Sequence, residues 1–150
     1  MRVVIQRVLR AEVRSNGYGS NRIGKGLFIL LGIEDSDNEA DIAWLVGKIS
    51  RLRIFSDADG VMNLSVMDVN GGIMIISQFT LHASTRKGNR PSYIRAARPE
   101  TAIPLYEIFV EQVKQATGLE VQTGWFGAMM QIELINDGPV TIIIDSKDKE

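Results

Sequence analysis

The chain has 150 residues, of which 45% are hydrophobic and 23% charged, and its net charge is −1. This length favours one compact domain, which we expect to span residues 1–150. The absence of cysteine excludes disulfides, thiolate nucleophiles and cysteine-ligated metals, and the single histidine, His82, excludes a multi-histidine zinc site within one chain.

Residues 1–7 read as a strand and lack the long apolar core and cleavage site of a signal peptide. The longest apolar runs are far too short to span a bilayer. We therefore expect a cytoplasmic protein without membrane contact. His82 lacks an adjacent triad pattern and is assigned no role.

The first half of the chain predicts strands around one helix. The continuous apolar run 26–33 is consistent with a strand buried on both faces. Ser36 and Glu39 have the spacing of a capping box, and apolar residues then recur at helical spacing from Ile42 to Ile49. Further strands are predicted at 2–8, 9–14, 52–55 and 73–81, with turns at 16–19, 57–60 and 70–72.

The second half predicts a loop, a helix and a final group of strands. Residues 84–98 show no clear period and are interpreted as a loop. A helix is expected from about Pro99 to Gly118, since glycine commonly follows the last residue of a helix. This pattern predicts one α/β or α+β domain with a mixed sheet. The last strands are expected at 119–123, 129–135 and 140–145, with Asn136–Pro139 interrupting the final pair.

Polar residues end a strongly apolar predicted strand at Ser77, Gln78 and Thr80. Strand ends are where sites open to solvent, and the backbone N–H groups beyond this strand are suited to stabilising an oxyanion. The alternative is a strand whose alternate side chains simply face water. The pattern alone favours that alternative, because short polar patterns often arise without function.

A second candidate segment is Asn136–Thr141, which contains Gly138 and Pro139. Glycine tolerates positive φ and close approach of another chain, and proline removes a backbone donor. A rigid corner of this kind can aim carbonyl oxygens at a ligand ammonium group. The alternative, which residue chemistry alone favours, is an ordinary tight turn between strands.

The loop 84–98 is a third candidate, because it carries basic residues and no acidic residue. Such a local surface can bind phosphates even when the total charge is near zero, and Tyr93 could stack on a base. A solvated loop with scattered charges is an equally good interpretation. The basic residues are Arg86, Lys87, Arg90, Arg95 and Arg98.

Taken together, these segments resemble the D-aminoacyl-tRNA deacylase (D-tyrosyl-tRNA deacylase) family from Met1 to about Ser146. The long motifs Ser77–Leu81 and Asn136–Thr141, in this order and separation, are highly specific as a pair. Residues 147–150 look like a variable tail. Shorter matches are Val4–Val8, Leu52–Phe55, Met62–Leu64, Thr85–Gly88, Arg90–Ser92 and Thr123–Gly124.

The resemblance implies a fold and an assembly. The fold is α/β, a compact single domain with barrel-like mixed β-sheet layers and two main helices. It is homodimeric, and its active sites lie at the interface between the two subunits.

The resemblance also implies roles for named residues. Ser77, Gln78, Phe79 and Thr80 form the catalytic wall of the pocket. Gly138 and Pro139, joined by a cis peptide, reach in from the other subunit and exclude an L side chain, and Arg7 braces them. Ala102 and Met129 lie near the pocket for the terminal adenosine or aminoacyl group. Arg86, Lys87 and Arg90 are the implied tRNA contacts.

The implied reaction is hydrolysis of the ester of D-aminoacyl-tRNA, and of mischarged glycyl-tRNA, without a metal or other cofactor. An unactivated threonine is a weak nucleophile, so we favour assistance from the terminal ribose hydroxyl of the tRNA over a covalent intermediate on Thr80. Two alternatives stay open. One is a nucleic-acid-binding module without catalysis, and the other is a metal-independent esterase for small esters.

Overall fold

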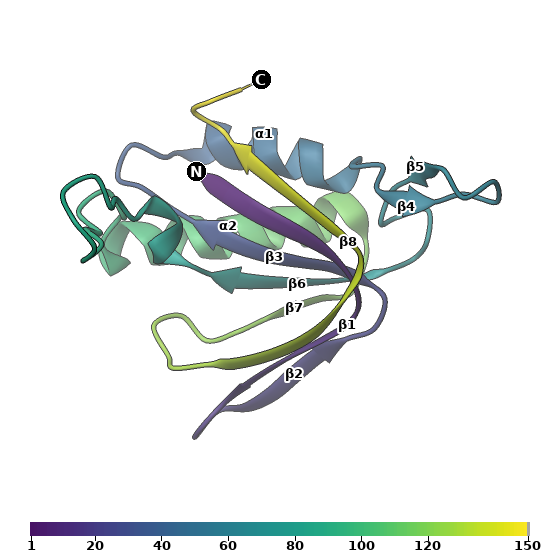
Figure 1. The fold of residues 1–150 in the computed structure, drawn as a ribbon, viewed down its shortest axis with the longest axis horizontal. Helices are drawn as coiled ribbons and strands as arrows, with labels where there is room; N and C mark the ends of the chain where they lie inside the picture. The colour runs from purple at the N-terminus through teal and green to yellow at the C-terminus, as the bar shows by residue number, and fades with distance from the viewer. Residues whose placement is uncertain (150) are drawn as a thin grey trace.

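The computed structural model describes residues 1–149 as a curved mixed β-sheet with two helices packed against it (Figure 1). The helices are α1 (Glu39–Ser50) and α2 (Pro99–Thr117), and a short 3-10 helix, η1 (Phe79–His82), follows the sixth strand. The strands are β1 (Arg2–Ser15), β2 (Gly19–Ile23), β3 (Gly26–Gly32), β4 (Phe55–Ser56), β5 (Met62–Leu64), β6 (Gly72–Ser77), β7 (Val121–Thr123) and β8 (Gln131–Asp145).

The main sheet combines antiparallel and parallel pairing. The long strand β1 pairs antiparallel with β2, β3 and β8, whereas β3, β6 and β7 run parallel to one another. The side-chain amide of Asn21 on β2 donates to the carbonyl oxygen of Thr123 on β7 at 2.7 Å, and this contact nearly closes the sheet. The expected compact α/β domain with a barrel-like mixed sheet and two helices is therefore confirmed.

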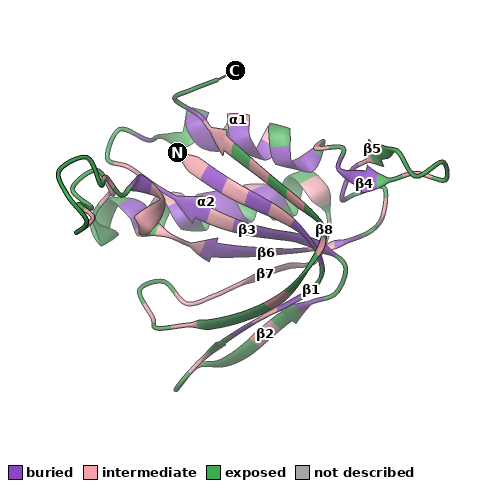
Figure 2. Cartoon of the chain, in the orientation of Figure 1, coloured by how far each residue is buried: buried purple, intermediate pink, exposed green. Residues whose placement is uncertain are grey.

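Apolar side chains on the two faces of the sheet form two separate cores. Figure 2 shows the buried residues along β3 and β6 in purple. The larger core lies between the sheet and the helices, and Leu45 and Phe109 are fully buried there. The smaller core fills the inside of the barrel with side chains such as Phe28 and Met74. Because side chains of β3 pack into both cores, its sequence is apolar throughout, as the run 26–33 predicted.

Two glycines allow β3 and β6 to approach at their starts. Gly26 and Gly72 are paired across the parallel strands, and a Cβ on Gly26 would lie 1.8 Å from the carbonyl oxygen of Gly72. No side chain fits in that space, so glycine is required at position 26 for the strands to begin together.

Several sequence predictions of local structure were wrong. The strand predicted at 52–55 is the two-residue strand β4, and the strands predicted at 129–135 and 140–145 are one strand, β8. Residues 2–8 and 9–14 belong to one continuous strand, because β8 pairs with β1 along nearly its whole length. The strand predicted at 73–81 ends at Ser77, and its last residues turn into η1. The cap of α1 is Asn38 with Asp41, not Ser36 with Glu39. The strands β2 and β5 were missed, since short exposed strands carry no apolar run.

The chain ends beside α1. Lys147 donates from Nζ to the Asp41 carboxylate at 2.8 Å, and Glu150 lies outside the described residues. The variable tail at 147–150 remains a prediction. Neither helix within residues 1–149 is both long and apolar enough to cross a membrane.

Candidate functional site

The parallel strands β3, β6 and β7 end at one edge of the sheet. Ser77 ends β6 and Thr123 ends β7, so the segments that follow both strands lie at this carboxyl edge. In open α/β sheets this edge is where ligands bind. The topology therefore brings Ser77–Thr80 and Gly124–Phe126 to the same end of the molecule.

The segment Ser77–Thr80 leaves its strand and turns sharply. Phe79 is 55% exposed at the surface, and Gln78 donates from Nε2 to the Thr80 hydroxyl at 2.6 Å. The first hydrogen bond of the turn runs from the Leu81 N–H to the Gln78 carbonyl at 3.2 Å. The N–H groups of Phe79 and Thr80 precede that bond, so they have no acceptor within the turn.

The Thr80 hydroxyl is hydrogen-bonded to the side-chain amide of Gln78, and no basic group (carboxylate or imidazole) is hydrogen-bonded to it among residues 1–149. His82, three positions after Phe79, is buried, and its Nδ1 lies 3.9 Å from Glu34 instead. This arrangement lacks the adjacent base that activates a threonine nucleophile.

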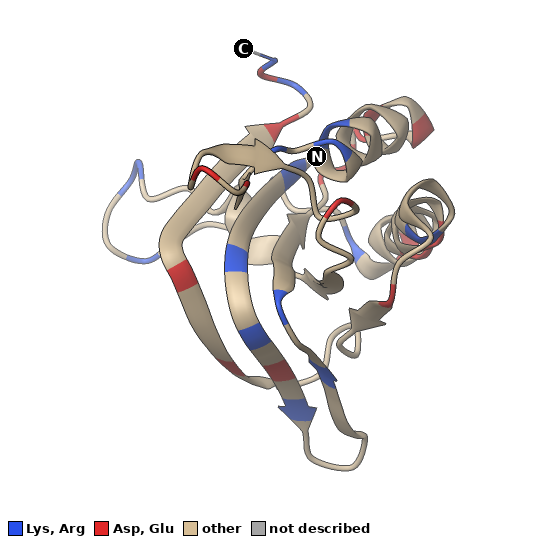
Figure 3. Cartoon of the chain, turned by 90° about the vertical axis from the view of Figure 1, so that its right-hand side faces the viewer, with Lys and Arg blue, Asp and Glu red and all other residues tan. Residues whose placement is uncertain are grey.

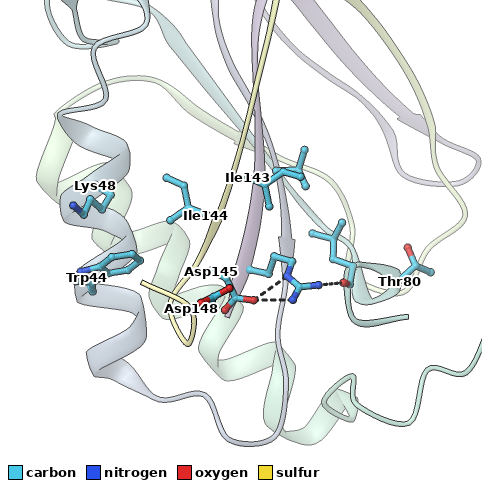
Figure 4. A pocket seen from close by; sticks show the side chains of 10 residues that line it. Trp44, Lys48, Thr80, Ile143, Ile144, Asp145 and Asp148 are labelled. Carbon is cyan, nitrogen blue, oxygen red and sulfur yellow. Dashed lines mark hydrogen bonds and ion pairs between the residues drawn. The ribbon is translucent and has the colours of Figure 1, made fainter. Parts of the chain in front are cut away.

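A hollow of about 680 Å³ opens beside Thr80 (Figure 4). Thr80 lies on one side of it, Ile143 and Ile144 of β8 lie in the middle, and Trp44 and Lys48 of α1 lie on the other side. The walls thus offer a hydroxyl, an indole, the cations of Arg2 and Lys48 and the carboxylates of Asp145 and Asp148 around the two isoleucines. Among residues 1–149, no three His, Cys, Asp or Glu side chains group together to hold a metal ion.

A second hollow, of about 490 Å³, is lined by aromatic side chains between α2 and the end of β7. The rings of Tyr106 and Phe126 meet edge to face at 5.9 Å, and those of Tyr18 and Trp125 lie 5.5 Å apart. Tyr106 donates from its hydroxyl to the Ile75 carbonyl at 2.8 Å, and burial raises the pKa of Tyr106. Sequence reasoning missed this cluster, because its rings come from three distant segments.

The two residues predicted near the adenosine pocket lie close to this cluster. Ala102 is buried in α2, one turn before Tyr106, so its small side chain packs in the core. Met129 is 90% exposed and lines a smaller hollow of about 350 Å³ that it shares with Phe126. Only Met129 is therefore free to contact a ligand directly.

Gly138 and Pro139 protrude from the sheet as a bulge. Between the pairs Gln6–Thr141 and Val8–Asn136, β8 has four residues where β1 has only Arg7. The Gly138–Pro139 peptide is cis, Gly138 has a φ of 128°, and both residues are exposed or half-buried at the surface. The predicted interruption at 136–139 is thus a bulge within one continuous strand.

The side chain of Arg7 fixes this bulge through contacts with Asp137. Its Nε donates to the Asp137 carbonyl at 3.0 Å and lies 3.2 Å from the Asp137 carboxylate. Its Nη1 donates to the carbonyl of Ile54, and the side chain is buried. The backbone that carries Gly138 is therefore fixed to the core of the same chain.

The two long sequence motifs do not meet within one chain. Because β6 pairs with β3 and β3 pairs with β1, Ser77 lies at the same position along the sheet as Val3 of β1. The bulge lies opposite Arg7 of β1. Four residues of strand separate these levels by roughly 13 Å, and three strand spacings separate β6 from β8 by roughly 14 Å. Gly138 and Thr80 therefore lie in different parts of the chain's surface (Figure 1).

The basic loop 84–98 flanks the carboxyl edge. Tyr93 packs edge to face on Phe79, with ring centroids 5.1 Å apart, so it covers one side of the turn that begins at Phe79. Arg95 pairs with Glu34 at 3.1 Å and is not free for phosphate. The side chains of Arg86, Lys87 and Arg90 are exposed and make no ion pair among the described residues.

Comparisons with known proteins agree on one family. The sequence model of the family described as D-Tyr-tRNA(Tyr) deacylase matches residues 4–145 of this chain. Proteins named D-aminoacyl-tRNA deacylase are 63% identical in Flavobacterium psychrophilum and 60% identical in Parabacteroides distasonis, over all of both chains. A solved structure named c-Myc DNA Unwinding Element Binding Protein superposes with a TM-score of 0.90 at 40% identity, covering 97% of this chain and 98% of that one. The chain belongs to the D-Tyr-tRNA(Tyr) deacylase family.

Proposed function

We propose that this protein is a D-aminoacyl-tRNA deacylase, a hydrolase that releases free tRNA and a D-amino acid in the cytoplasm. The observation that carries the proposal is the turn Phe79–His82 at the carboxyl edge, which is exposed at Phe79 and has N–H groups that precede its first hydrogen bond. Full-length relatives that bear this enzyme's name support it.

In the proposed reaction, water attacks the ester carbonyl carbon beside Thr80. The N–H groups of Phe79 and Thr80 stabilise the oxyanion, and Ser77 and Gln78 complete the wall that orients the ester. The bond from the carbonyl carbon to the ribose oxygen then breaks, and that oxygen takes the proton that the attacking water has lost. The neighbouring ribose hydroxyl assists this transfer, because Thr80 has no base beside it.

The terminal adenosine is proposed to occupy the aromatic hollow. Its base would stack on Phe126 or Trp125, since single-stranded RNA bases are commonly bound by aromatic rings. Met129 would cover the base at the exposed rim, and Ala102 would keep the adjoining wall of α2 small. Arg86, Lys87 and Arg90 are proposed to contact the phosphates that follow.

The chiral filter is proposed to come from a second copy of the chain. Gly138 and Pro139 lie at the surface and are rigidly held by Arg7, but they lie away from Thr80 of their own chain. A homodimer would bring the Gly-cis-Pro carbonyls of one copy to the ester held by the other and would leave no room for an L side chain. Glycine has no side chain, so glycyl-tRNA would also be hydrolysed. The exposed isoleucines of β8 that would support such an interface are Ile132, Ile135 and Ile143.

The test is paired hydrolysis of D-tyrosyl-tRNA and L-tyrosyl-tRNA by the purified protein with a chelator present. We expect rapid loss of the D ester alone. Turnover of D-aminoacyl esters that lack tRNA at an equal rate would favour a small-molecule esterase instead. Folded protein that hydrolyses neither ester but binds duplex DNA would favour a nucleic-acid-binding module.

A further inference from the structure

A third hollow, of about 570 Å³, runs along the outer face of α1 and the residues after it. Its lining includes three basic residues and no acidic residue, although the net charge of the whole chain is −1. Lys48 and Arg51 follow Trp44 at positions i+4 and i+7, so the three side chains share one face of the helix. The lining residues are Ala43, Trp44, Gly47, Lys48, Arg51, Leu52 and Arg53.

The cationic side chains of this groove, Lys48, Arg51 and Arg53, form no ion pair with another residue among residues 1–149. Arg51 and Arg53 each donate only from Nε to a backbone carbonyl, at 3.0 and 2.8 Å, which fixes the guanidinium groups and leaves their Nη atoms free among the described residues. Figure 3 shows the lysine and arginine segments of the chain in blue.

One acidic residue near the groove, Asp68, is already bound, whereas Asp148 lines the adjoining hollow beside Trp44 and Lys48. The pKa of Asp68 is lowered by hydrogen bonds from Ser65 and, to a smaller extent, by the charge of Arg53, but the two side chains do not form an ion pair. The Lys48 ammonium lies 5.4 Å from the Trp44 ring centroid, and that of Lys149 lies 5.0 Å from it. Two ammonium groups therefore lie against the indole.

The groove is connected to the candidate active site. Trp44 and Lys48 line both this groove and the hollow beside Thr80, so the two depressions share these side chains. Asp145 and Asp148 lie between Trp44 and Thr80 in that hollow, and Asp145 is paired with Arg2 (Figure 4). A chain that enters at Thr80 and continues past Trp44 would reach Arg51 and Arg53. Its chemistry must suit fixed cations and one aromatic face.

We propose that this α1 groove (Trp44, Lys48, Arg51 and Arg53) binds the phosphodiester backbone of the tRNA whose terminal ester lies at Thr80. The three cations contact phosphates, and Trp44 stacks on an unpaired base. This inference rests on the proposed function for the identity of the RNA. It adds a contact surface separate from the loop 84–98.

A direct binding experiment tests the groove without relying on catalysis. The double variant Arg51→Gln/Arg53→Gln, which changes only residues that do not line the hollow beside Thr80, is compared with Arg22→Gln/Lys25→Gln, which removes two exposed cations elsewhere. Fluorescence anisotropy with uncharged tRNA is measured over a series of salt concentrations. We expect the groove variant to raise Kd by about tenfold and to reduce the slope of log K against log salt by about one to two, with the control close to wild type.

Two further measurements separate the possible failures. With D-aminoacyl-tRNA the groove variant should raise KM and leave kcat unchanged, while hydrolysis of D-aminoacyl-adenosine should not change. Wild-type protein that binds tRNA through the groove yet hydrolyses no ester would overturn only the proposed function. Equal Kd and salt slope in both double variants would overturn the groove. Equally tight binding of duplex DNA, with the same loss in the groove variant, would overturn the assignment to tRNA.

Discussion

Arg2 joins the turn Phe79–His82 to the end of β8 through one guanidinium group. Its Nη1 donates to the carbonyl oxygen of Leu81 at 2.8 Å, while its Nε and Nη2 bind the Asp145 carboxylate at 2.9 and 2.8 Å. Leu81 lies within η1, directly after Thr80. Arg2 therefore fixes the turn whose N–H groups we assign to the oxyanion.

We expect Arg2→Gln to lower kcat for D-aminoacyl-tRNA by about tenfold with little change in KM, because misplaced oxyanion donors weaken binding of the transition state more than of the substrate. Arg2→Lys should recover part of the loss. Arg10→Gln is the matched control, since Arg10 also pairs with β8, at Glu133, but does not contact η1. An equal fall in kcat in this control would refute the positioning role.

Gly138 has no room for a side chain. A Cβ there would lie 2.9 Å from Cγ2 of Val140 and 3.2 Å from Nη2 of Arg7, and its φ of 128° is unfavourable for other residues. We expect Gly138→Ala to abolish deacylation or to bring the D and L rates together, while the dimer still forms. The check is paired D and L hydrolysis with size-exclusion chromatography.

Gly17→Ala is the control for backbone strain alone. Gly17 also has positive φ, 86°, but nothing lies within 4 Å of the position that a Cβ would take there. Normal rates and chirality are expected in this variant. Full activity with unchanged selectivity in Gly138→Ala would remove the bulge from the site.

Thr80→Ala separates the two mechanisms of ester hydrolysis. We expect turnover within about threefold of wild type, because the Thr80 hydroxyl accepts a hydrogen bond from Gln78 and has no base to activate it. Single-turnover hydrolysis of D-tyrosyl-tRNA is the measurement. Severe loss in a protein with an unchanged circular dichroism spectrum would restore Thr80 as the nucleophile.

Asp41 links α1 to the end of the chain and should make stability depend on pH. Although burial opposes ionisation, hydrogen bonds from Lys147, Ser146 and the Asn38 backbone lower the pKa of Asp41 to about 2. Since the folded pKa lies below the unfolded value of 3.8, the stabilisation is complete above about pH 4 to 5 and is lost as the pH falls toward about 2.

The corresponding variant is Asp41→Asn, which removes this titration and weakens the cap of α1. We expect a loss of about 1 to 2 kcal/mol in the free energy of unfolding at about pH 7, and a smaller difference from wild type at about pH 2 to 3. Urea unfolding at both pH values measures this. A difference that stays constant with pH would show that Asp41 does not titrate in this range.

Local patterns predicted the buried strands and both helices, but not where segments from distant parts of the chain meet. The run 26–33 and the glycine at 118 act through neighbours in sequence, so they could be recognised directly. The turn at Phe79 could not, because it depends on Arg2 and on the carbonyl of Leu31, which accepts from the Gln78 N–H. The aromatic hollow and the α1 groove likewise exist only after folding.

The separation of Thr80 from Gly138 within one chain has a genetic consequence under the proposed dimer. A chain damaged at Gly138 and a chain whose turn Phe79–His82 is disrupted would each be inactive as a homodimer. In a mixed dimer, one of the two sites would combine the intact turn of the first chain with the intact bulge of the second. Co-expression of two defective alleles should therefore restore activity that neither allele has alone.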